Sequence, residues 1–387
     1  MGRMGDVVVV GAGIGGLTAA VAFARRGWSV TVLERAESLE PVGAGIALAP
    51  NAVRALDAVG LADDVRAMAA LSGEVGLRRP DGAWLVKASA DEATGQLDER
   101  PVLLHRAQLV GLLADALPDG ALRLGARVVR VEPGDRETRA RVTIAPTEVL
   151  EADLVVAADG IDSPTRAALF PTHPGPTYTG VTAWRFVTHD PVPVQPAETW
   201  GRGSIVGLTP LADGRVYCYL TAVLPEGTRF GDEADELRRR FAGWHDPIPA
   251  LLDGLDPADV LHHDLRWLAT PLPRFDVGRV ALVGDAAHAM PPNLGQGGCQ
   301  ALEDAVTLAA FVDHGPDVRT ALSLYSVTRV PRTTKVARMS ARVGAPSAWT
   351  GRSAVALRDL GMWLTGPVAP RLAMRQLRPV LDWRPPA

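Results

Sequence analysis

Residues 6–16 read Asp-Val-Val-Val-Val-Gly-Ala-Gly-Ile-Gly-Gly, and this stretch decides the fold. A short apolar run precedes the pattern G-x-G-x-x-G, and a helix-like segment follows at 17–26. A second apolar run at 29–33 then ends in Glu34. Strand, glycine loop, helix, strand and acid in this order predict a unit that binds the adenosine end of a dinucleotide. The glycines of the pattern are Gly11, Gly13 and Gly16.

The chemistry of this loop limits the nucleotide that it can bind. Glycines let backbone N–H groups approach a pyrophosphate, and the carboxylate of Glu34 can accept hydrogen bonds from ribose hydroxyls. The same carboxylate would repel a 2′-phosphate, so the expected nucleotide is part of FAD or NAD, not NADP. A glycine-rich turn without a ligand is the weaker alternative in this context.

The composition excludes several classes of function. The chain has 387 residues, of which 47% are hydrophobic and 22% charged, and its net charge is -4. This length predicts two domains, no run is long enough to span a membrane, and no basic excess indicates nucleic acid. Cys218 and Cys299 lie far apart, which favours the reducing cytoplasm and gives no thiolate metal site. We therefore expect a cytoplasmic protein with small-molecule partners, no metal, no membrane and no nucleic acid.

A second motif lies at 153–166. An apolar strand is expected at 153–157, and Asp159-Gly160 forms a tight turn after it. Ser163 and Pro164 are residue types preferred at the N-cap and the first position of a helix. Because ligands of open parallel sheets bind at the carboxyl ends of the strands, this turn is a candidate binding element.

A third motif lies at 279–298, where a short apolar strand runs into a proline- and glycine-rich loop that contains Asp285. A helix is expected to begin near Gly298. A loop aimed at the start of a helix gathers free N–H groups and the positive end of the helix dipole. The loop is either a binding site for a negatively charged group or a strand-to-helix connection that binds no ligand.

Residues 179–270 are rich in β-strand patterns. In the strand predicted at 216–223, alternation with a period of two places polar and aromatic side chains on one face. These side chains are Arg215, Tyr217, Tyr219 and Thr221. The face is either a wall over a ligand or a solvent face with amphipathic tyrosines, and the sequence leaves both open.

Three further expectations concern helices. Asn51 is a possible N-cap of a helix that ends at Gly60. Arg106 opens another helix, where a cation is disfavoured unless it meets an anion, so this residue is either a phosphate contact or a solvated side chain. A long helix at 318–343 is expected to be interrupted near Pro331.

Together, the three motifs resemble those of the class A flavin-dependent monooxygenases, which have the para-hydroxybenzoate hydroxylase fold. The resemblance covers nearly the whole chain. It is greatest for the branch of salicylate hydroxylase, urate hydroxylase and zeaxanthin epoxidase. The segments that indicate this branch are Gly43-Ala44-Gly45-Ile46, Thr182-Ala183-Trp184-Arg185 and Asp382-Trp383-Arg384-Pro385-Pro386.

The resemblance implies an α/β fold with a Rossmann-type FAD-binding domain, an inserted β-rich substrate domain and a C-terminal helical segment. The FAD-binding domain is expected at 1–72, 97–178 and 271–344. The substrate domain is expected at 73–96 and 179–270, and the helical segment at 345–387.

The resemblance also assigns roles to residues. It implies contacts with the cofactor for Gly11, Gly13, Gly16, Glu34, Arg35, Gly45, Arg106, Asp159, Arg166, Asp285, Gly295, Gly297 and Gly298. Asp285 is expected at the ribityl chain, and the loop 291–298 at the flavin ring. The expected catalytic residues are Arg185, Tyr217 and Pro291, with Trp184 as an alternative wall residue. A surface ion pair and a packing tyrosine are the alternatives for the first two.

The implied activity is that of an FAD-dependent monooxygenase. NAD(P)H, as a transiently bound co-substrate, reduces FAD, which captures O2 as a C4a-hydroperoxide and inserts one oxygen atom into a small aromatic or alkene-containing substrate. Gly43, Gly45, Gly297 and Gly298 are expected to provide backbone freedom for flavin movement. A flavin-dependent reductase or oxidase and a non-catalytic flavoprotein that sequesters a pathway intermediate stay open. So do the substrate, hydroxylation or epoxidation, NADH or NADPH, the general base, and a monomer or homodimer.

Overall fold

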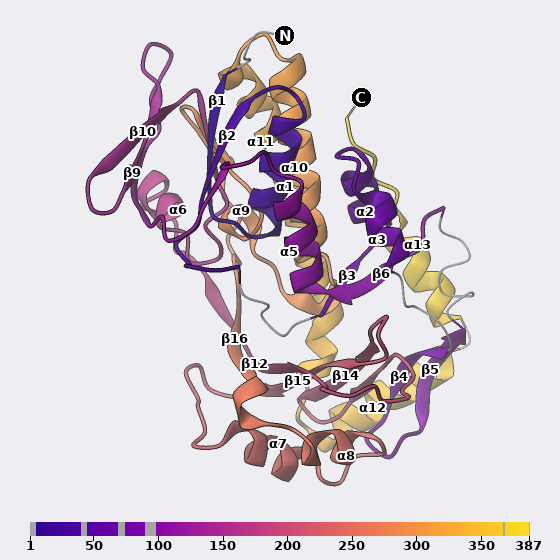
Figure 1. Cartoon of the computed structure of the whole chain (residues 1–387). Coiled ribbons are helices and arrows are strands. Elements are labelled where there is room, and N and C mark those ends of the chain that lie inside the picture. Colours follow the sequence, from indigo (N-terminus) through magenta and orange to yellow (C-terminus); the bar gives the residue numbers. More distant parts are fainter. Residues whose placement is uncertain (1–4, 40–44, 69–73, 90–97, 367, 387) are drawn as a thin grey trace.

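A six-stranded sheet forms the centre of the larger part of the molecule (Figure 1). The computed structural model describes residues 5–39, 45–68, 74–89, 98–366 and 368–386. The strand order is β17-β18-β11-β1-β2-β7, and every neighbouring pair is parallel except β17 with β18. The strands are β1 (Asp6–Val10), β2 (Ser29–Leu33), β7 (Leu122–Arg123), β11 (Leu154–Ala157), β17 (Asp276–Val277) and β18 (Val280–Leu282).

Both faces of this sheet are covered, which explains its continuous valine runs. The helices α1 (Ile14–Ala24) and α10 (Gly297–His314) lie side by side on one face, where an ideal Cβ on Gly15 would be 3.2 Å from Ala301 Cβ. A three-stranded sheet lies toward the other face (Figure 1). Its strands are β8 (Val128–Glu132), β9 (Ala140–Ile144) and β10 (Glu148–Ala152). The predicted α/β fold with a Rossmann-type unit is therefore confirmed.

A short ribbon connects this part to the second sheet. It consists of β3 (Gly45–Leu48) and β6 (Val102–His105), which pair antiparallel. The helices near it are α2 (Pro50–Asp57), α3 (Ala62–Ala67) and α5 (Arg106–Asp115).

The second sheet has seven strands in the order β16-β12-β15-β14-β13-β4-β5. They are β4 (Glu74–Arg78), β5 (Trp84–Ser89), β12 (Thr177–Val187), β13 (Ala197–Trp200), β14 (Ser204–Pro210), β15 (Val216–Val223) and β16 (Leu261–Trp267). The helices α7 (Glu233–Phe241) and α8 (Ile248–Asp253) cover its face away from the first sheet (Figure 1). Because strands from 74–89 and 177–267 share this sheet, we propose the domain boundaries given above.

The remaining elements are mostly helical, and they include the predicted C-terminal segment. They are α6 (Pro164–Leu169), α9 (Asp285–His288), α11 (Val318–Gly344), α12 (Arg352–Thr365), α13 (Ala369–Leu381) and the 3-10 turns η1 (Pro257–Asp259), η2 (Pro292–Leu294) and η3 (Ala345–Ala348). Within the described residues, no helix is long and apolar enough to cross a membrane.

The predicted interruption near Pro331 is wrong, because α11 continues through this residue. Proline removes one helical N–H and so frees the carbonyl of Val327, four residues earlier. Pro331 is exposed, and Val327 is 72% exposed. The helix continues because the ring and the freed carbonyl lie on its solvent side.

Candidate active site

The glycine loop lies between the ends of β1 and β11 and accepts no side chain at two positions. Gly11 has a φ of +100°, and an ideal Cβ there would lie 2.5 Å from the carbonyl oxygen of Ala158. On Gly16, the same atom would lie 2.0 Å from the carbonyl oxygen of Gly11. An ideal Cβ on Gly13 meets no atom of the described chain within 4 Å. The loop therefore packs against the sheet on one side and leaves open space beside Gly13.

Glu34 lies beside this loop, at the end of β2. Its Oε2 accepts a hydrogen bond from the N–H of Ala12 at 2.8 Å, and its Oε1 accepts one from Ala36 at 2.9 Å. These bonds fix the carboxylate at the edge of the open space. Arg35 is exposed and has no ion-pair partner among the described residues.

Two helix N-termini meet at the open side of the loop. The N-cap of α1 is Gly13 and that of α10 is Gln296, and neither helix has a side-chain cap or an acidic residue in its first turn. Ile14 Cδ1 is 3.9 Å from an ideal Cβ on Gly298. Free N–H groups and the positive ends of two helix dipoles are therefore close together, which suits an extended anionic ligand.

The loop after β18 presents Asp285. Gly284 has a φ of +59°, and its N–H donates to Asp304 Oδ2 at 2.9 Å. The helix α9 follows at once, where the sequence predicts irregular loop; one helical turn is too short for apolar periodicity to reveal. Asp285 is exposed while the rest of α9 is buried, so its carboxylate can reach a ligand.

A buried group of charged and amide side chains holds this loop from behind. Arg329 has no exposed surface and donates to Asp304 Oδ1 at 2.7 Å and Glu303 Oε2 at 2.5 Å. Asp304 also pairs with Nε2 of His288, at 2.5 Å. We call this group the Arg329 cluster; its members are Asn51, His288, Gln296, Gln300, Glu303, Asp304, Arg329 and Arg332.

The Arg329 cluster also fixes the start of α10. Asn51 Nδ2 donates to Gln296 Oε1 at 3.0 Å and to Glu303 Oε1 at 2.7 Å. The prediction that Asn51 is an N-cap is wrong, because α2 begins at Pro50 and its N-cap is Ala49. Proline suits the first helical position, and Asn51 then turns inward. The sequence reasoning missed this cluster; its visible signal was the pair Glu303-Asp304 inside an apolar run, since buried charges need partners.

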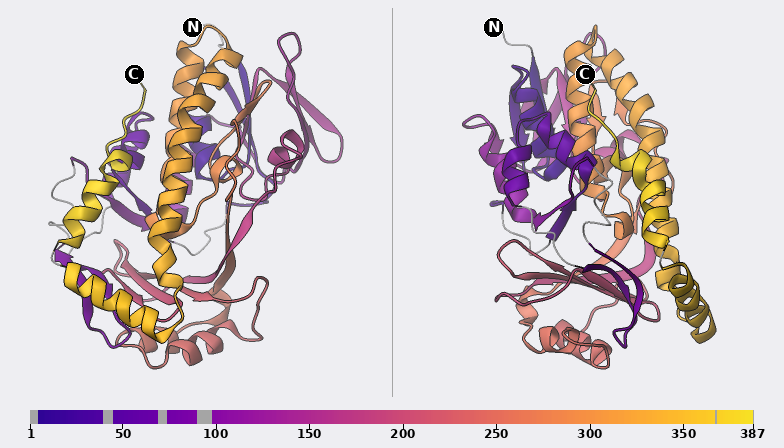
Figure 2. Two further views of the ribbon diagram at one scale, coloured as in Figure 1. Left: turned by 180° about the vertical axis from the view of Figure 1, so that it is seen from behind. Right: turned by 90° about the vertical axis from the view of Figure 1, so that its right-hand side faces the viewer.

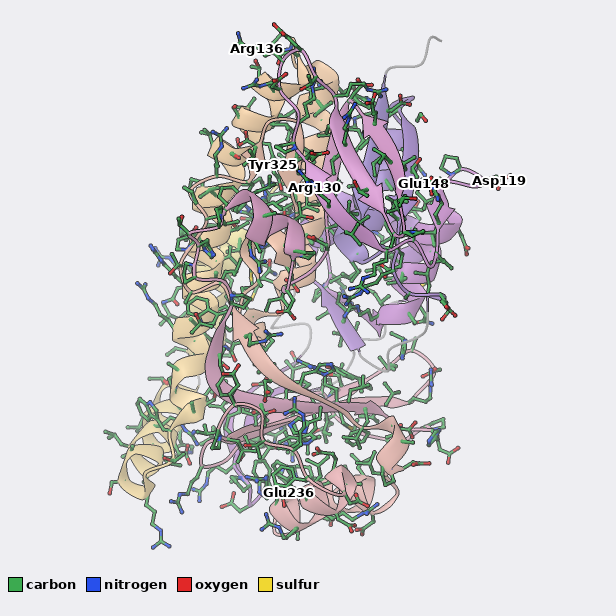
Figure 3. The ribbon with its side chains drawn as sticks, turned by 90° about the vertical axis from the view of Figure 1, so that its left-hand side faces the viewer. Asp119, Arg130, Arg136, Glu148, Glu236 and Tyr325 are labelled. Atoms are coloured by element: carbon green, nitrogen blue, oxygen red, sulfur yellow. The ribbon has the colours of Figure 1, made fainter. Side chains whose placement is uncertain are left out.

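Tyr325 supports the same region from α11. Its hydroxyl donates to the carbonyl of Leu282 in β18 at 2.9 Å. Figure 3 labels Tyr325 between the long helices and the sheet.

The Arg329 cluster also affects the pKa of Asp304. Burial by itself would raise this pKa, but the positive charges of His288 and Arg329 outweigh the effect of burial and lower it.

The second motif packs against α9. Ser163 caps α6 as predicted, since its Oγ accepts from the N–H of Arg166 at 2.8 Å. Arg166 is buried and donates to the carbonyl of Ala286 at 3.1 Å. Burial lowers the pKa of Arg166, and nearby carboxylates including Asp159 and Asp285 oppose that effect. The structure thus brings Asp159, Arg166 and Asp285 together.

Asp159 has one oxygen without a partner. Its Oδ2 accepts from the N–H of Thr165 at 3.1 Å, whereas Oδ1 is buried and has no hydrogen-bond partner in the described part of the chain. A buried carboxylate oxygen is costly unless a donor reaches it. Oδ1 is therefore a candidate acceptor for a ligand hydroxyl or amide.

The polar face predicted on β15 is directed toward β3. Tyr217 and Tyr219 alternate with buried residues, as predicted. An ideal Cβ on Gly45 would lie 2.5 Å from the ring of Tyr217, so this tyrosine packs on β3 and is not on a solvent face. Arg185 pairs in register with Tyr219. Burial raises the pKa of Tyr217, and the positive charges of Arg185 and Arg106 oppose this rise.

Two cations near Tyr217 lack carboxylate partners. Neither Arg185 nor Arg106 forms an ion pair with a described residue. The nearby Glu198 is occupied, because it accepts hydrogen bonds from the hydroxyl of Tyr219 and from Nε1 of Trp200. The positive charge on this face is therefore free to interact with an anionic group.

Trp184 does not belong to this face, so the alternative that it forms a wall of the site is wrong. Its side chain has no exposed surface and lies in the core beneath α7, stacked on His262 with ring centroids 4.7 Å apart. Its Nε1 donates to Glu233 at 2.7 Å. Because side chains alternate along a strand, Trp184 and Arg185 point to opposite faces.

Comparisons with known proteins identify the family. The family described as FAD binding domain matches residues 4–340. The chain is 35% identical to the aurachin C monooxygenase/isomerase of Stigmatella aurantiaca, over 91% of this chain and 92% of that protein. The chain belongs to the class A flavin-dependent monooxygenases. Another member, the FAD-dependent urate hydroxylase of Mycolicibacterium vanbaalenii, is 34% identical over 84% of each chain. The crystal structure of Klebsiella pneumoniae HpxO with FAD and uric acid matches with a TM-score of 0.85 and 28% identity, covering 92% of each chain.

The cofactor of this flavin-dependent monooxygenase is FAD, and the geometry fits it. The adjoining helix N-termini and the open side of Gly13 could hold the pyrophosphate, and Glu34 could accept from a ribose. Asp285 and the unpartnered Asp159 Oδ1 could receive hydroxyl groups of the connecting chain. The charge of Arg106 also acts on Tyr217, and its predicted contact with the cofactor stays a prediction.

The loop at the start of α10 also fits a ring system. Gly295 has a φ of +61°, and an ideal Cβ on Gly297 meets no atom of the described chain within 4 Å. Pro291 is buried, and its carbonyl accepts from Ser340 Oγ at 2.6 Å. Backbone N–H groups beside an open Gly297 can therefore approach a planar ligand closely.

Replacing Gly45 with valine should impair the monooxygenase at least tenfold in turnover. The new side chain would collide with Tyr217, and overpacking of about 1–3 kcal/mol displaces side chains. The close approach of Tyr217 is a reason for glycine at position 45, and the predicted backbone freedom stays a prediction. Gly43 lies outside the described residues. Stopped-flow rates of reduction and oxygenation test this, with Gly231→Val as a control in open space. Unchanged rates for Gly45→Val would contradict it.

Proposed function

We propose that this enzyme uses NAD(P)H and O2 to insert one oxygen atom into a small, electron-rich aromatic or heteroaromatic substrate that binds as an anion. The observation that carries the proposal is the position of β3. One residue of β3, Gly45, contacts Tyr217 of the cationic face, and the next, Ile46, has its Cδ1 2.9 Å from an ideal Cβ on Gly298 of α10. The substrate face and the expected flavin loop therefore adjoin.

Each part of the chain has a role in this proposal. FAD, when bound and reduced, would supply the activation of O2 and the transfer of one oxygen atom to the substrate. The free N–H groups of Gly297 and Gly298 stabilise negative charge at the adjoining edge of the site; single donors of this kind contribute about 3 kcal/mol elsewhere. The Arg329 cluster holds those groups in place, so they need no rearrangement during the reaction.

The cations on the substrate face define the kind of substrate. Arg185 and Arg106 lack carboxylate partners among the described residues, and an anion between them would supply the charge interaction that they lack. Cations favour the ionised form of a phenol, enol or acidic heterocycle, which is also its electron-rich form. A substrate bound as an anion needs no separate general base. The relatives named for urate and aurachin C are consistent with this class.

A panel of acidic aromatic and heteroaromatic compounds tests the proposal. For the purified holoenzyme, the expected result is substrate-stimulated NAD(P)H oxidation together with a product that contains one additional oxygen atom. Substrate reduction or simple peroxide release would instead favour a reductase or oxidase. If no ligand allowed NAD(P)H to bleach the flavin, a sequestering flavoprotein would be favoured.

Asp159→Ala should slow flavin reduction by NAD(P)H at least tenfold while FAD stays bound. Asp159 presents its unpartnered Oδ1 beside Arg166 and α9, and the resemblance implies that this motif contributes to binding both FAD and NAD(P)H. In the variant, Asp285 and the glycine loop would still hold FAD. Stopped-flow bleaching of the flavin measures this step. Asp162→Ala is the control, because Asp162 is exposed and its carboxylate is already paired with Arg266 at 2.7 Å. Normal reduction in Asp159→Ala with full FAD content would refute the role.

A further inference from the structure

Tyr219 lies across the inner face of the seven-stranded sheet. Figure 2 shows that this face is turned toward the part that contains the six-stranded sheet, with α7 and α8 on the opposite side. Tyr219 pairs in register with Arg185 of β12 and with Gly207 of β14. An ideal Cβ on Gly207 would overlap the ring of Tyr219, so the ring extends across β14 toward β13. Glycine at position 207 therefore lets this ring lie on the sheet.

The hydroxyl of Tyr219 ends at Glu198. This glutamate pairs in register with Gly207, so Arg185, Tyr219, Gly207 and Glu198 lie side by side on four adjacent strands. We call these four residues the Tyr219 row. Glu198 Oε1 accepts a hydrogen bond from the Tyr219 hydroxyl, and its Oε2 accepts one from Nε1 of Trp200 at 2.7 Å. Both carboxylate oxygens therefore have a donor.

These bonds fix the direction of the Tyr219 hydroxyl. Because a carboxylate only accepts hydrogen bonds, Tyr219 must donate its one hydrogen to Glu198. Burial raises the pKa of Tyr219, and the charge of Glu198 raises it further, so the hydroxyl keeps this hydrogen. Only its lone pairs are left for another partner. Toward any ligand, Tyr219 is therefore an acceptor and not a donor.

Tyr219 adjoins the residues of the substrate face. Its ring centroid is 5.9 Å from that of Tyr217, which packs on Gly45 of β3. Tyr219 is only partly buried, so a ligand on this face can reach it. In the Tyr219 row, Arg185 lies on one side of Tyr219 and Glu198 on the other. A planar ligand across the row would therefore place one edge at the cation and the opposite edge near the hydroxyl.

We propose that Tyr219 is a specificity-determining residue, which selects substrates that carry an N–H or O–H donor on the edge opposite their anionic group. Glu198 is the positioning residue that sets this polarity. The inference rests on the proposed function, because it takes the anionic substrate from there. It narrows the substrate class to planar, acidic aromatic ring systems with a hydrogen-bond donor. A substrate with an acceptor at that edge would face the lone pairs of Tyr219 and bind more weakly.

Three benzoates test this selection. 4-Aminobenzoate presents a donor opposite its carboxylate, 4-cyanobenzoate presents an acceptor, and 4-methylbenzoate presents neither. Isothermal titration calorimetry of the oxidised holoenzyme measures their dissociation constants without requiring turnover. For the wild type, 4-aminobenzoate should bind about fivefold tighter than 4-methylbenzoate, and 4-cyanobenzoate should bind most weakly.

Glu198→Gln should invert this preference. Because Nε1 of Trp200 can only donate, the new amide should turn its oxygen toward Trp200 and its NH2 group toward Tyr219. The hydroxyl of Tyr219 then accepts from the amide and directs its own hydrogen at the ligand. 4-Cyanobenzoate should now bind about fivefold tighter than 4-aminobenzoate. A merely structural role of Glu198 would weaken the binding of all three benzoates alike.

Two further variants complete the test. Tyr219→Phe has no hydroxyl, so its dissociation constants for 4-aminobenzoate and 4-methylbenzoate should agree within about twofold. Glu233→Gln is the matched control, because Glu233 also accepts from a tryptophan, Nε1 of Trp184 at 2.7 Å, but lies on α7 at the other face of the sheet. This control should keep the wild-type order of the three benzoates.

The results that would contradict the inference differ from those that would contradict the proposed function. Equal affinity of the wild type for the three benzoates, or the wild-type order kept in Glu198→Gln or Tyr219→Phe, would overturn the roles of Tyr219 and Glu198 and leave the proposed function standing. If none of the benzoates binds at millimolar concentration, the anionic substrate class is wrong, and this inference is wrong with it.

Discussion

Arg329→Met should lower the free energy of unfolding by about 3–5 kcal/mol, because it leaves two buried carboxylates without their shared cation. Arg329, Glu303 and Asp304 have no exposed surface, and the guanidinium contacts the two carboxylates at 2.5 and 2.7 Å. Asp304 also holds the N–H of Gly284, so the loop that presents Asp285 should loosen and FAD should bind more weakly. Urea unfolding, followed by flavin fluorescence and circular dichroism, measures both effects.

The loss caused by Arg329→Met should depend on pH. In the wild type the pKa of Asp304 is lowered, so this group contributes stability above its unfolded pKa, and that stability is lost as pH falls through the folded pKa. Without Arg329 that pKa should rise, while His288 and the N–H of Gly284 still oppose the effect of burial. The difference in stability between wild type and variant should therefore be largest above the unfolded pKa of Asp304 and should shrink as pH falls through its folded pKa.

The matched control for Arg329→Met is Arg338→Met, on the same helix. Arg338 is exposed and has no ion pair with a described residue, so its replacement should cost less than about 0.5 kcal/mol. A similarly small loss for Arg329→Met, or the same loss at every pH, would contradict the role assigned to the Arg329 cluster.

Arg185→Met should reduce kcat/KM for the best substrate of the panel by roughly 100-fold. A hydrogen bond to a charged group contributes about 1.5–3 kcal/mol, and each 1.4 kcal/mol is a factor of ten. Methionine keeps much of the length of the side chain but removes its charge. Reduction of the flavin by NAD(P)H without substrate should change less than threefold, because Arg185 faces the substrate.

Arg215→Met is the control for Arg185→Met. Arg215 lies on the same face but pairs with Asp213 at 2.8 Å, so it has no free charge to offer a substrate. Its replacement should change kcat/KM less than threefold. An equal loss in both variants would mean that the general positive charge of the face matters, and not the position of Arg185.

The backbone motifs of the fold could be predicted from the sequence because they are local. Gly11 and Gly16 indicate the two positions where the loop after β1 lies too close to backbone for a side chain, and Ser163 with Pro164 indicates the start of α6, because each signal depends on local residue types. The alternation that places Tyr217 and Tyr219 on one face of β15 is equally local.

Contacts between distant segments could not be predicted. Asn51 and Gln296 are 245 positions apart, and their hydrogen bond decides that Asn51 turns inward and does not cap a helix. Likewise, only the structure shows that Gly45 meets Tyr217 and that Trp184 faces α7. Pro331 stays helical because of which side of α11 faces solvent, and this is decided by packing.

Oxygen labelling tests the central claim most directly. The holoenzyme is supplied with NAD(P)H, the best substrate of the panel and O2 enriched in oxygen-18, and the product is analysed by mass spectrometry. We predict that the product carries one oxygen-18 atom from O2 and none from labelled water in the converse experiment. Label incorporated from water alone, or NAD(P)H oxidised with no label in any product, would contradict the assignment as a monooxygenase.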